Sequence, residues 1–539
     1  MTESFDFIIV GAGSAGCVLA NRLTASGNHK VLLIEAGGSD RSFWVQMPIG
    51  YGRTFHHPHM NWRYMTEPEE ILGGRRLYWP RGRLLGGSSA INAMVFIRGQ
   101  HADFDAWRDK GNPGWGFRDV LPYFRRMEDN MNGEDAYRGI GGPLSVTSTA
   151  AHVHPLCARF IAAGMDIGLA HNSDFNAATQ EGVGHYQITT RGGIRASTAS
   201  AYLRPAMRRR NLQVVIGAHA TRILFTAGRA IGIEYRRGTS TCVVHAKSEV
   251  ILAAGAINSP QLLQLSGVGP GALLQSLGIP VIHAHEGVGR NLQDHLGLDY
   301  IYRTNVPTLN NVLRPWWGRV GVGLRYLATR GGPLSLSVNQ AGGFMRTDLK
   351  RARPNLQIYF SPLSYTRPVP GKRQLMLPDP EPGVLLGISN CHPRSRGTIE
   401  IATADPHQAP LIRPNYLTHP NDEEELVNGA LMLRRLTASP ALSEVITQEL
   451  QPGPAVSDRT AMAADLRLRS GSVFHACGTC AMGPNDGRNV VDPRLRVHGL
   501  SGLRVVDASV FPLITAGNIN APTIMVAEKA ADLILEDAN

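Results

Sequence analysis

A single histidine stands among small residues near the end of the chain, and it is a candidate for proton transfer. His475 lies within residues 473–483, Val-Phe-His-Ala-Cys-Gly-Thr-Cys-Ala-Met-Gly. Because a histidine side chain titrates near neutrality, it can take a proton from a hydroxyl group. Asn518 and Asn520 precede an alanine-rich helical pattern, where with Pro522 they also suit ordinary helix capping. A lone histidine is more often structural, so the assignment needs support from the elements around it.

The N-terminal segment predicts a dinucleotide site. Within some 30 residues it reads as strand, glycine turn, helix, strand and acid, at 7–10, 11–16, 17–23, 30–34 and 35. Gly11 allows the tight turn, Gly13 lets the backbone approach a pyrophosphate, and Gly16 lets helix and strand pack closely. The helix N-terminus offers free N–H groups to phosphates. Glu35 can accept hydrogen bonds from a ribose diol, which favours FAD or NAD over NADP.

Two further segments are rich in glycine and serine. Residues 82–99 place such residues side by side before an apolar run, which suits a backbone pressed against a flat ligand. A plain helix-capping loop is the alternative. Residues 255–269 follow an apolar strand pattern, and Ser259-Pro260 is typical of a helix N-cap with proline at the first helical position.

With these segments, the sequence resembles the glucose–methanol–choline (GMC) oxidoreductase family. Both segments match the family's two signature motifs, and the resemblance covers essentially the whole chain, with bacterial choline dehydrogenases and FAD-dependent alcohol dehydrogenases most similar. It implies an α/β and α+β fold: a discontinuous Rossmann-like FAD-binding domain with an inserted substrate domain built on an antiparallel sheet with helices. Ile91 occupies the position where several relatives carry a histidine linked to the flavin, so we expect non-covalent FAD.

The same resemblance implies roles for individual residues. His475 matches the base of the family's H-x-x-G-T motif, and Asn518, eleven residues before Lys529, matches its partner at the developing alkoxide. Asp507, which ends an apolar strand pattern, matches the acid near the ribityl and pyrophosphate groups; a strand-end cap is the alternative. The expected FAD contacts are Gly11, Gly13, Ser14, Ala15, Gly16, Glu35, Ala36, Trp62, Arg83, Gly86, Gly87, Ser88, Asn92, Ala93, Met94, Val95, Ala220, Asp507, Ala508, Asn518, Asn520 and Thr523.

Because the FAD segments recur along the chain, the nucleotide domain cannot be one continuous block. We expect it to comprise 1–150, 196–299 and 466–539, with catalytic residues in the last part. The substrate domain is expected to comprise 151–195 and, mainly, 300–465. By analogy, residues 331–344 and 359–365 are expected to border the pocket.

Composition excludes several classes of protein. The 539 residues are 43% hydrophobic and 18% charged, as in an ordinary globular protein. The net charge of +11 is scattered, without the basic stripe of a nucleic-acid-binding protein. Six dispersed cysteines do not form a disulfide framework. Cys477 and Cys480 have C-x-x-C spacing without a second pair, and the cluster at 56–59 has no nearby acids, so we expect no metal.

The N-terminus lacks a signal-peptide pattern, and no apolar stretch is long enough to span a bilayer, so we expect a cytoplasmic protein. Residues 314–327 mix aromatic side chains with arginines. This segment could rest peripherally on the inner face of the anionic cytoplasmic membrane, with ordinary packing in the substrate domain as the alternative.

The sequence therefore predicts FAD-dependent oxidation of a primary alcohol to the aldehyde. A small-molecule alcohol would be the electron donor, and a quinone, an artificial acceptor or O2 would be the electron acceptor. Choline dehydrogenation is a specific alternative. A hydroxynitrile-type lyase, a photodecarboxylase, an NAD-dependent reductase and an inactive flavin-binding protein stay open, as do the identity of the alcohol and the oligomeric state.

Overall fold

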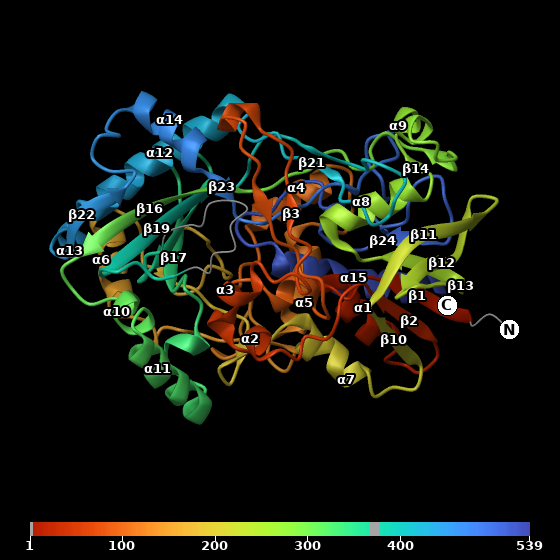
Figure 1. Ribbon diagram of the computed structural model, residues 1–539, viewed down its shortest axis with the longest axis horizontal. Coiled ribbons are helices and arrows are strands. Elements are labelled where there is room, and N and C mark those ends of the chain that lie inside the picture. Colours follow the sequence, from red (N-terminus) through yellow and green to blue (C-terminus); the bar gives the residue numbers. More distant parts are fainter. Residues whose placement is uncertain (1–3, 366–376, 539) are drawn as a thin grey trace.

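The computed structural model describes residues 4–365 and 377–538. One half of the molecule is built on a seven-stranded sheet in the order β10-β2-β1-β13-β12-β11, with β24 also paired to β13 (Figure 1). The bounds of its strands are β1 Ser4–Val10, β2 Val31–Glu35, β10 Leu212–Ile216, β11 Ala218–Thr226, β12 Arg229–Arg237, β13 Ser240–Leu252 and β24 Leu503–Val505. β10, β2, β1, β13 and β24 run parallel, while β11 and β12 pair antiparallel. The buried, apolar β2 is typical of a parallel strand covered on both faces.

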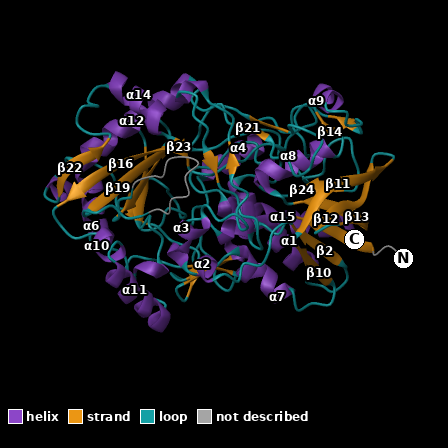
Figure 2. Ribbon diagram, viewed as in Figure 1, coloured by secondary structure: helices purple, strands orange, loops and turns teal. Residues whose placement is uncertain are grey.

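A second seven-stranded sheet occupies the other half and is antiparallel (Figure 2). Its order is β22-β16-β19-β18-β17-β7, with β23 also paired to β16. The bounds are β7 Gly182–His185, β16 Leu296–Thr304, β17 Ala341–Met345, β18 Leu356–Ser361, β19 Gly383–Asn390, β22 Ile446–Gln451 and β23 Gly471–Ser472. The expected fold class, a Rossmann-like part with an antiparallel substrate sheet, is confirmed. How the chain divides into domains remains a proposal.

Shorter elements connect and cover the two sheets. The helices are α1 Ser14–Leu23, α2 Phe43–Gln46, α3 Tyr51–Thr54, α4 His101–Asp109, α5 Phe117–Met127, α6 Leu156–Asp166, α7 Arg204–Ala206, α8 Gly255–Leu265, α9 Gly271–Ser276, α10 Leu309–Leu313, α11 Trp316–Thr329, α12 Pro420–Thr437, α13 Pro440–Ser443, α14 Arg459–Arg469 and α15 Asn520–Ala538. The remaining strands form two-residue or three-residue pairs: β3 Tyr64–Met65, β4 Tyr78–Trp79, β5 Glu128–Asn130, β6 Leu144–Val146, β8 Thr190–Arg191, β9 Ile194–Arg195, β14 Val268–Gly269, β15 His283–Ala284, β20 Thr398–Glu400 and β21 Leu411–Arg413.

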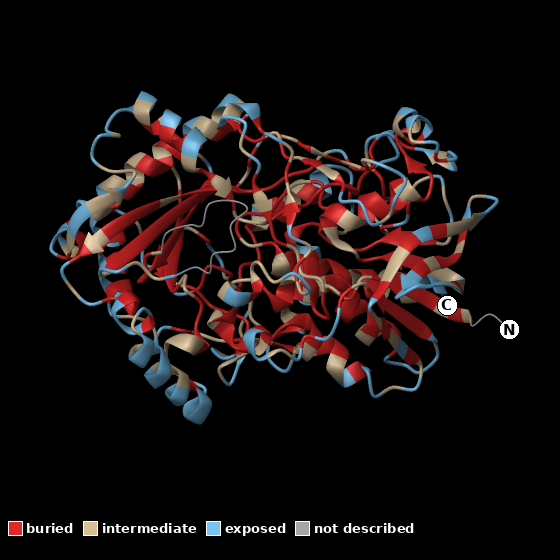
Figure 3. Ribbon diagram, in the orientation of Figure 1, coloured by how far each residue is buried: buried red, intermediate tan, exposed pale blue. Residues whose placement is uncertain are grey.

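Each sheet has its own buried core, and Figure 3 shows both interiors as buried ribbon. In the part of the chain that the structure describes, no helix is both long and apolar enough to cross a membrane.

Two helices of the first half are locked together by one buried carboxylate. Glu528 in the middle of α15 is fully buried and accepts two hydrogen bonds from Arg22 of α1, at 2.9 and 2.7 Å. Arg126 of α5 and the hydroxyl of Tyr202 also donate to it. Since a buried charge is tolerated only when it is well paired, this network fixes α1 against α15.

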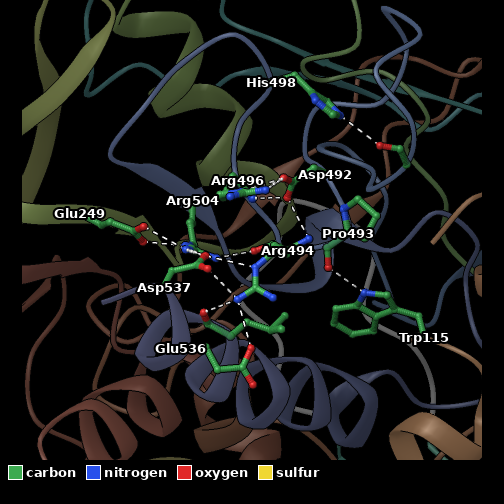
Figure 4. Close-up of polar contacts among 12 residues, drawn as sticks. Trp115, Glu249, Asp492, Pro493, Arg494, Arg496, His498, Arg504, Glu536 and Asp537 are labelled. Atoms are coloured by element: carbon green, nitrogen blue, oxygen red, sulfur yellow. Dashed lines mark hydrogen bonds and ion pairs between the residues drawn. The ribbon is translucent and has the colours of Figure 1, made fainter. Parts of the chain in front are cut away.

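The far end of α15 is tied to the sheet by a second network (Figure 4). Arg504 of β24, almost wholly buried, donates to Glu249 of β13 at 2.6 Å and to Asp537 of α15 at 2.5 Å. Arg494 donates to Asp537 as well, at 2.7 Å. The orientation of α15, and therefore of its N-terminal end, is fixed from both the middle and the end of the helix.

Candidate active site

One cavity reaches both sheets. At one end it is lined by Gly11, Gly13 and Glu35, which lie where β1 and β2 end. At the other end it is lined by Tyr359 of β18 and Leu385 of β19. The carboxyl edge of a parallel sheet is the usual place for a ligand in such folds, and here the second sheet closes that crevice.

Helices α1 and α15 both begin at this cavity. α1 starts at Ser14 with no side chain capping its first turn, and Ser14 and Ala15 line the cavity. Asn520 and Thr523 of the first turn of α15 line it as well. The Ser14 hydroxyl donates to the Asn520 side chain at 2.7 Å, so the two helix starts are directly joined. Their positive ends favour a negatively charged group, such as a pyrophosphate, between them.

Glu35 is held rigidly at the end of β2. Its carboxylate accepts from the backbone N–H groups of Ala12, at 2.9 Å, and Gly37, at 2.7 Å. Burial raises the pKa of Glu35 to about 7. A hydroxyl donor in the cavity would stabilise the ionised form, because each hydrogen bond to a carboxylate lowers its pKa.

The segment after Gly82 packs directly on the glycine turn. A Cβ at Gly87, where φ is +52°, would lie 2.7 Å from Cα of Gly13. Met94 also has a left-handed backbone, with φ +65°. Such conformations cost free energy in residues other than glycine and tend to occur at ligand sites. The wall from Gly87 to Val95 is thereby pressed against the nucleotide end of the cavity.

The structure brings most of the sequence-predicted residues to this cavity. Its lining includes Gly11, Gly13, Ser14, Ala15, Glu35, Ala36, Trp62, Gly87, Ser88, Asn92, Ala93, Met94, Val95, Ala220, His475, Asp507, Ala508, Asn518, Asn520 and Thr523. Gly16, Arg83 and Gly86 lie behind the lining. A Cβ at Gly16 would lie 1.8 Å from the Gly11 carbonyl oxygen, and the Arg83 guanidinium lies over the Trp62 ring.

Asp507 lies at the cavity but is already engaged by the protein. It accepts from the Ser259 hydroxyl at 2.6 Å and from the N–H groups of Gly255 and Ser509. Burial raises its pKa. Its contacts join the start of α8 to the residues after β24.

His475 belongs to a chain of hydrogen bonds that crosses from one half of the molecule to the other. Its Nε2 lies 3.1 Å from Nδ2 of Asn518, two residues before α15. Its Nδ1 lies 2.9 Å from Nδ1 of His295, directly before β16. Nε2 of His295 lies 3.0 Å from the carbonyl oxygen of Cys391, directly after β19.

The Cys391 carbonyl determines where the hydrogens lie in this chain. A carbonyl oxygen only accepts, so His295 must donate from Nε2, and its neutral ring then carries a lone pair at Nδ1. His475 therefore donates from Nδ1 to His295. Its own lone pair is at Nε2, beside the Asn518 amide and at the cavity.

Burial keeps both rings neutral. It lowers the pKa of His295 to about 3. Burial, with repulsion from His295 and Arg81, lowers the pKa of His475 well below its ordinary value. A neutral imidazole with a lone pair facing the cavity is able to accept a proton.

The backbone at His475 is held in place from two sides. Its N–H donates to Asp294 at 2.6 Å, and Asp294 also accepts from Ser472 at 2.5 Å. Phe474 has φ +72°, and its carbonyl accepts from Arg81 at 2.7 Å. The left-handed residue turns the chain so that His475 reaches the cavity from the edge of the second sheet.

Sequence reasoning missed His295, Asp294 and Cys391, and also Asp299 of β16, which lines the cavity. Cys391 contributes only its backbone, so no side-chain pattern could identify it. An apolar strand that starts directly after Gln293-Asp294-His295 was the available signal. Cys477 and Cys480 are fully buried, and burial raises the pKa of both thiols. Within residues 4–365 and 377–538, no group of three or more His, Cys, Asp or Glu side chains could hold a metal ion.

Comparisons with known proteins agree with this geometry. Models of the GMC oxidoreductase family match residues 5–297 and 393–527. An oxygen-dependent choline dehydrogenase of Photobacterium profundum is 43% identical over 99% of this chain and 94% of that protein. An alcohol dehydrogenase (acceptor) of Pseudomonas putida is 42% identical over 98% and 96%. The solved structure of pyridoxine 4-oxidase from Mesorbium loti matches with a TM-score of 0.88 and 31% identity, covering 98% of both chains.

The close approach of Gly87 to Gly13 gives a testable prediction for nucleotide retention. Gly87→Ala should weaken FAD binding at least about fivefold, because the added Cβ would lie 2.7 Å from Gly13 Cα and the segment would have to shift at the cavity wall to relieve this contact and the left-handed strain. The readout is the ratio of flavin to protein after purification and dialysis. Gly38→Ala is the matched control, because a Cβ there meets nothing within 4 Å. Equal flavin retention by both variants would contradict the packing described.

Proposed function

The chain belongs to the GMC oxidoreductase family, and we propose that it oxidises a primary alcohol to the aldehyde, with His475 as the base and Asn518 as the alkoxide partner. It is an FAD-dependent oxidoreductase that acts on CH–OH donors and passes electrons to an acceptor. The observation that carries the proposed roles is the contact at the cavity between His475 Nε2 and Asn518 Nδ2, which lie 3.1 Å apart.

The residues present fit FAD. Two helix N-termini and the glycine turn suit the pyrophosphate, and Glu35 suits the ribose. When bound, FAD supplies the acceptor for the hydride that leaves the alcohol's α-carbon. Ile91, which lines the cavity, has no nucleophilic atom, so we propose that the cofactor is held without a covalent bond.

His475 and Asn518 can together bind and deprotonate a hydroxyl. In the structure the Asn518 amide N–H donates to His475 Nε2, at 3.1 Å. A substrate hydroxyl that replaces this contact would donate to His475 Nε2 and accept from Asn518 Nδ2. As the proton moves to Nε2, the amide N–H remains to stabilise the alkoxide oxygen. Asn518 is oriented for this, because its Oδ1 faces the side-chain amide of Gln357 on β18, at 3.5 Å. The positive charge formed on His475 is adjacent to Nδ1 of neutral His295.

The second-sheet end of the cavity suits the carbon chain of an alcohol. Apolar and aromatic side chains line it, including Phe55, Val338, Leu385 and Phe474. Such a lining favours a substrate with a hydrocarbon body and a single hydroxyl at the polar end.

Choline is a second candidate, and Asp299 is the observation that favours it. This carboxylate lines the same end of the cavity, together with the rings of Tyr51, Tyr359 and Tyr365. Aromatic faces and an acid together are the usual recognition surface for a quaternary ammonium group.

We also propose that a quinone or O2 takes the electrons and that the protein is cytoplasmic, with peripheral contact to the inner face of the membrane. The name of one relative specifies oxygen, and that of the other specifies only an acceptor. The basic and aromatic segment 314–327 supports the membrane contact.

The reaction is tested by adding alcohols anaerobically to the purified, FAD-loaded protein. We expect a primary alcohol to bleach the flavin band near about 450 nm. His475→Gln should slow the bleaching about 100-fold or more, as expected on loss of a general base. His171→Gln, an exposed histidine, is the control and should react as the unmodified protein does. A yellow protein that no alcohol bleaches would refute the proposed reaction.

The two substrate classes are separated by Asp299→Asn. If choline is the substrate, its KM should rise at least about tenfold, because the cation loses its carboxylate partner. The KM for a neutral alcohol such as 1-butanol should change little. Asp348→Asn, at an exposed acid, serves as the control. Equal effects on choline and butanol would show that Asp299 does not recognise charge.

A further inference from the structure

Helix α11 projects from the protein with most of its surface in water (Figures 1 and 3). Of its fourteen residues only Tyr326 is buried. Trp316 and Trp317 are 66% and 65% exposed, and Val320, Leu324 and Leu327 are each more than half exposed. Large apolar side chains gathered on one outward helix mark an interaction surface, because scattered single residues are the norm elsewhere.

The apolar side chains form a stripe. Trp316, Val320, Leu324 and Leu327 are spaced by four, four and three residues, which places them on one face of a helix. The opposite face holds α11 to the protein: the Tyr326 hydroxyl donates to the Gly193 carbonyl, and Val322 packs on a buried cluster with Leu313. The polarity is the reverse of an ordinary surface helix, since the apolar face points outward. We call these four residues, with Trp317, the outer stripe.

Positive charge borders the outer stripe. Arg319 and Arg325 lie on its two sides by helical position, and Arg314 and Arg330 flank the helix ends. Residues 300–347 contain no Asp or Glu. The segment thus combines tryptophan and leucine on one face with arginines beside it, which is the pattern of a helix lying in the plane of a membrane interface.

The inner face of α11, opposite the outer stripe, lies next to the second-sheet end of the cavity. The cluster that holds Val322 also contains Val338 and Tyr365, and both of these line the cavity. Near the other end of α11, Phe43 of α2 contacts the Tyr326 ring, with centroids 6.4 Å apart. Phe43 and its neighbour Trp44 are 46% and 41% exposed, so the apolar surface continues onto α2.

We propose that α11 docks the protein on an anionic lipid bilayer, with the outer stripe in the headgroup and acyl boundary and with Arg319 and Arg325 at lipid phosphates. The docking surface rests on the membrane contact proposed above and identifies the residues that would make it. A bilayer fits better than a second copy of the chain, since two copies paired through α11 would bring eight arginines together without acids from this segment. Docking in this way brings the substrate end of the cavity close to the lipid, where apolar alcohols accumulate.

The test is co-sedimentation of the FAD-loaded protein with lipid vesicles, which measures membrane binding independently of enzymatic activity. We expect the protein to bind vesicles of phosphatidylcholine and phosphatidylglycerol at least about tenfold more tightly than phosphatidylcholine alone. Trp316→Ser with Leu324→Ser should reduce binding to the anionic vesicles at least about tenfold, because the buried apolar area is lost. Arg319→Glu with Arg325→Glu should reduce it by a similar factor.

The matched control variants carry the same kinds of substitution at exposed residues outside α11. Met131→Ser with Leu468→Ser changes two exposed apolar residues, and Arg208→Glu with Arg210→Glu changes two exposed arginines. Both should bind vesicles as the unmodified protein does. Failure of the unmodified protein to bind, or equal binding by the stripe variants, would overturn the proposal. So would a concentration-dependent dimer that the Trp316 and Leu324 changes abolish. Vesicle binding without alcohol oxidation would instead refute only the proposed reaction.

Discussion

The hydrogen bond from His295 to the Cys391 carbonyl sets the chemistry of the whole site. It fixes one hydrogen on His295, which fixes the next on His475, and so leaves one lone pair at the cavity. The atoms come from both halves of the molecule: Cys391 and His295 flank strands of the second sheet, and Asn518 precedes α15. The base is therefore formed only when the two sheets are packed against each other.

The half built on the parallel sheet supplies the helix N-termini at the cavity, and the half built on the antiparallel sheet supplies most of the lining at the substrate end. α1 and α15 are locked through Glu528, and α15 is tied to β13 and β24 through Arg504, so that both helix starts meet at the cavity. The second sheet contributes aromatic and apolar side chains together with Asp299. Backbone strain is found where these parts meet, at Met94 and Phe474, as expected where a ligand site overrides local preference.

Much of the nucleotide end could be predicted from sequence, because its signal is local. The turn at Gly11, the helix after it and Glu35 lie within one short stretch of chain, and each residue type has a specific geometric task. The second sheet and the partners of His475 could not be found in the same way. His295 and Asp299 are single polar residues at a strand. Cys391 contributes its backbone carbonyl, which every residue has, so its side-chain type gives no signal in the sequence. Their roles depend on contacts between residues that are 96 and 180 positions apart in the chain.

The most direct test of this account is a neutron crystal structure of the FAD-loaded protein at neutral pH, which shows hydrogen positions on the two rings. The account predicts hydrogen on Nδ1 of His475 and on Nε2 of His295, with no hydrogen on Nε2 of His475. Hydrogen on Nε2 of His475, in a neutral or a doubly protonated ring, would contradict the assignment of His475 as the base in the resting enzyme.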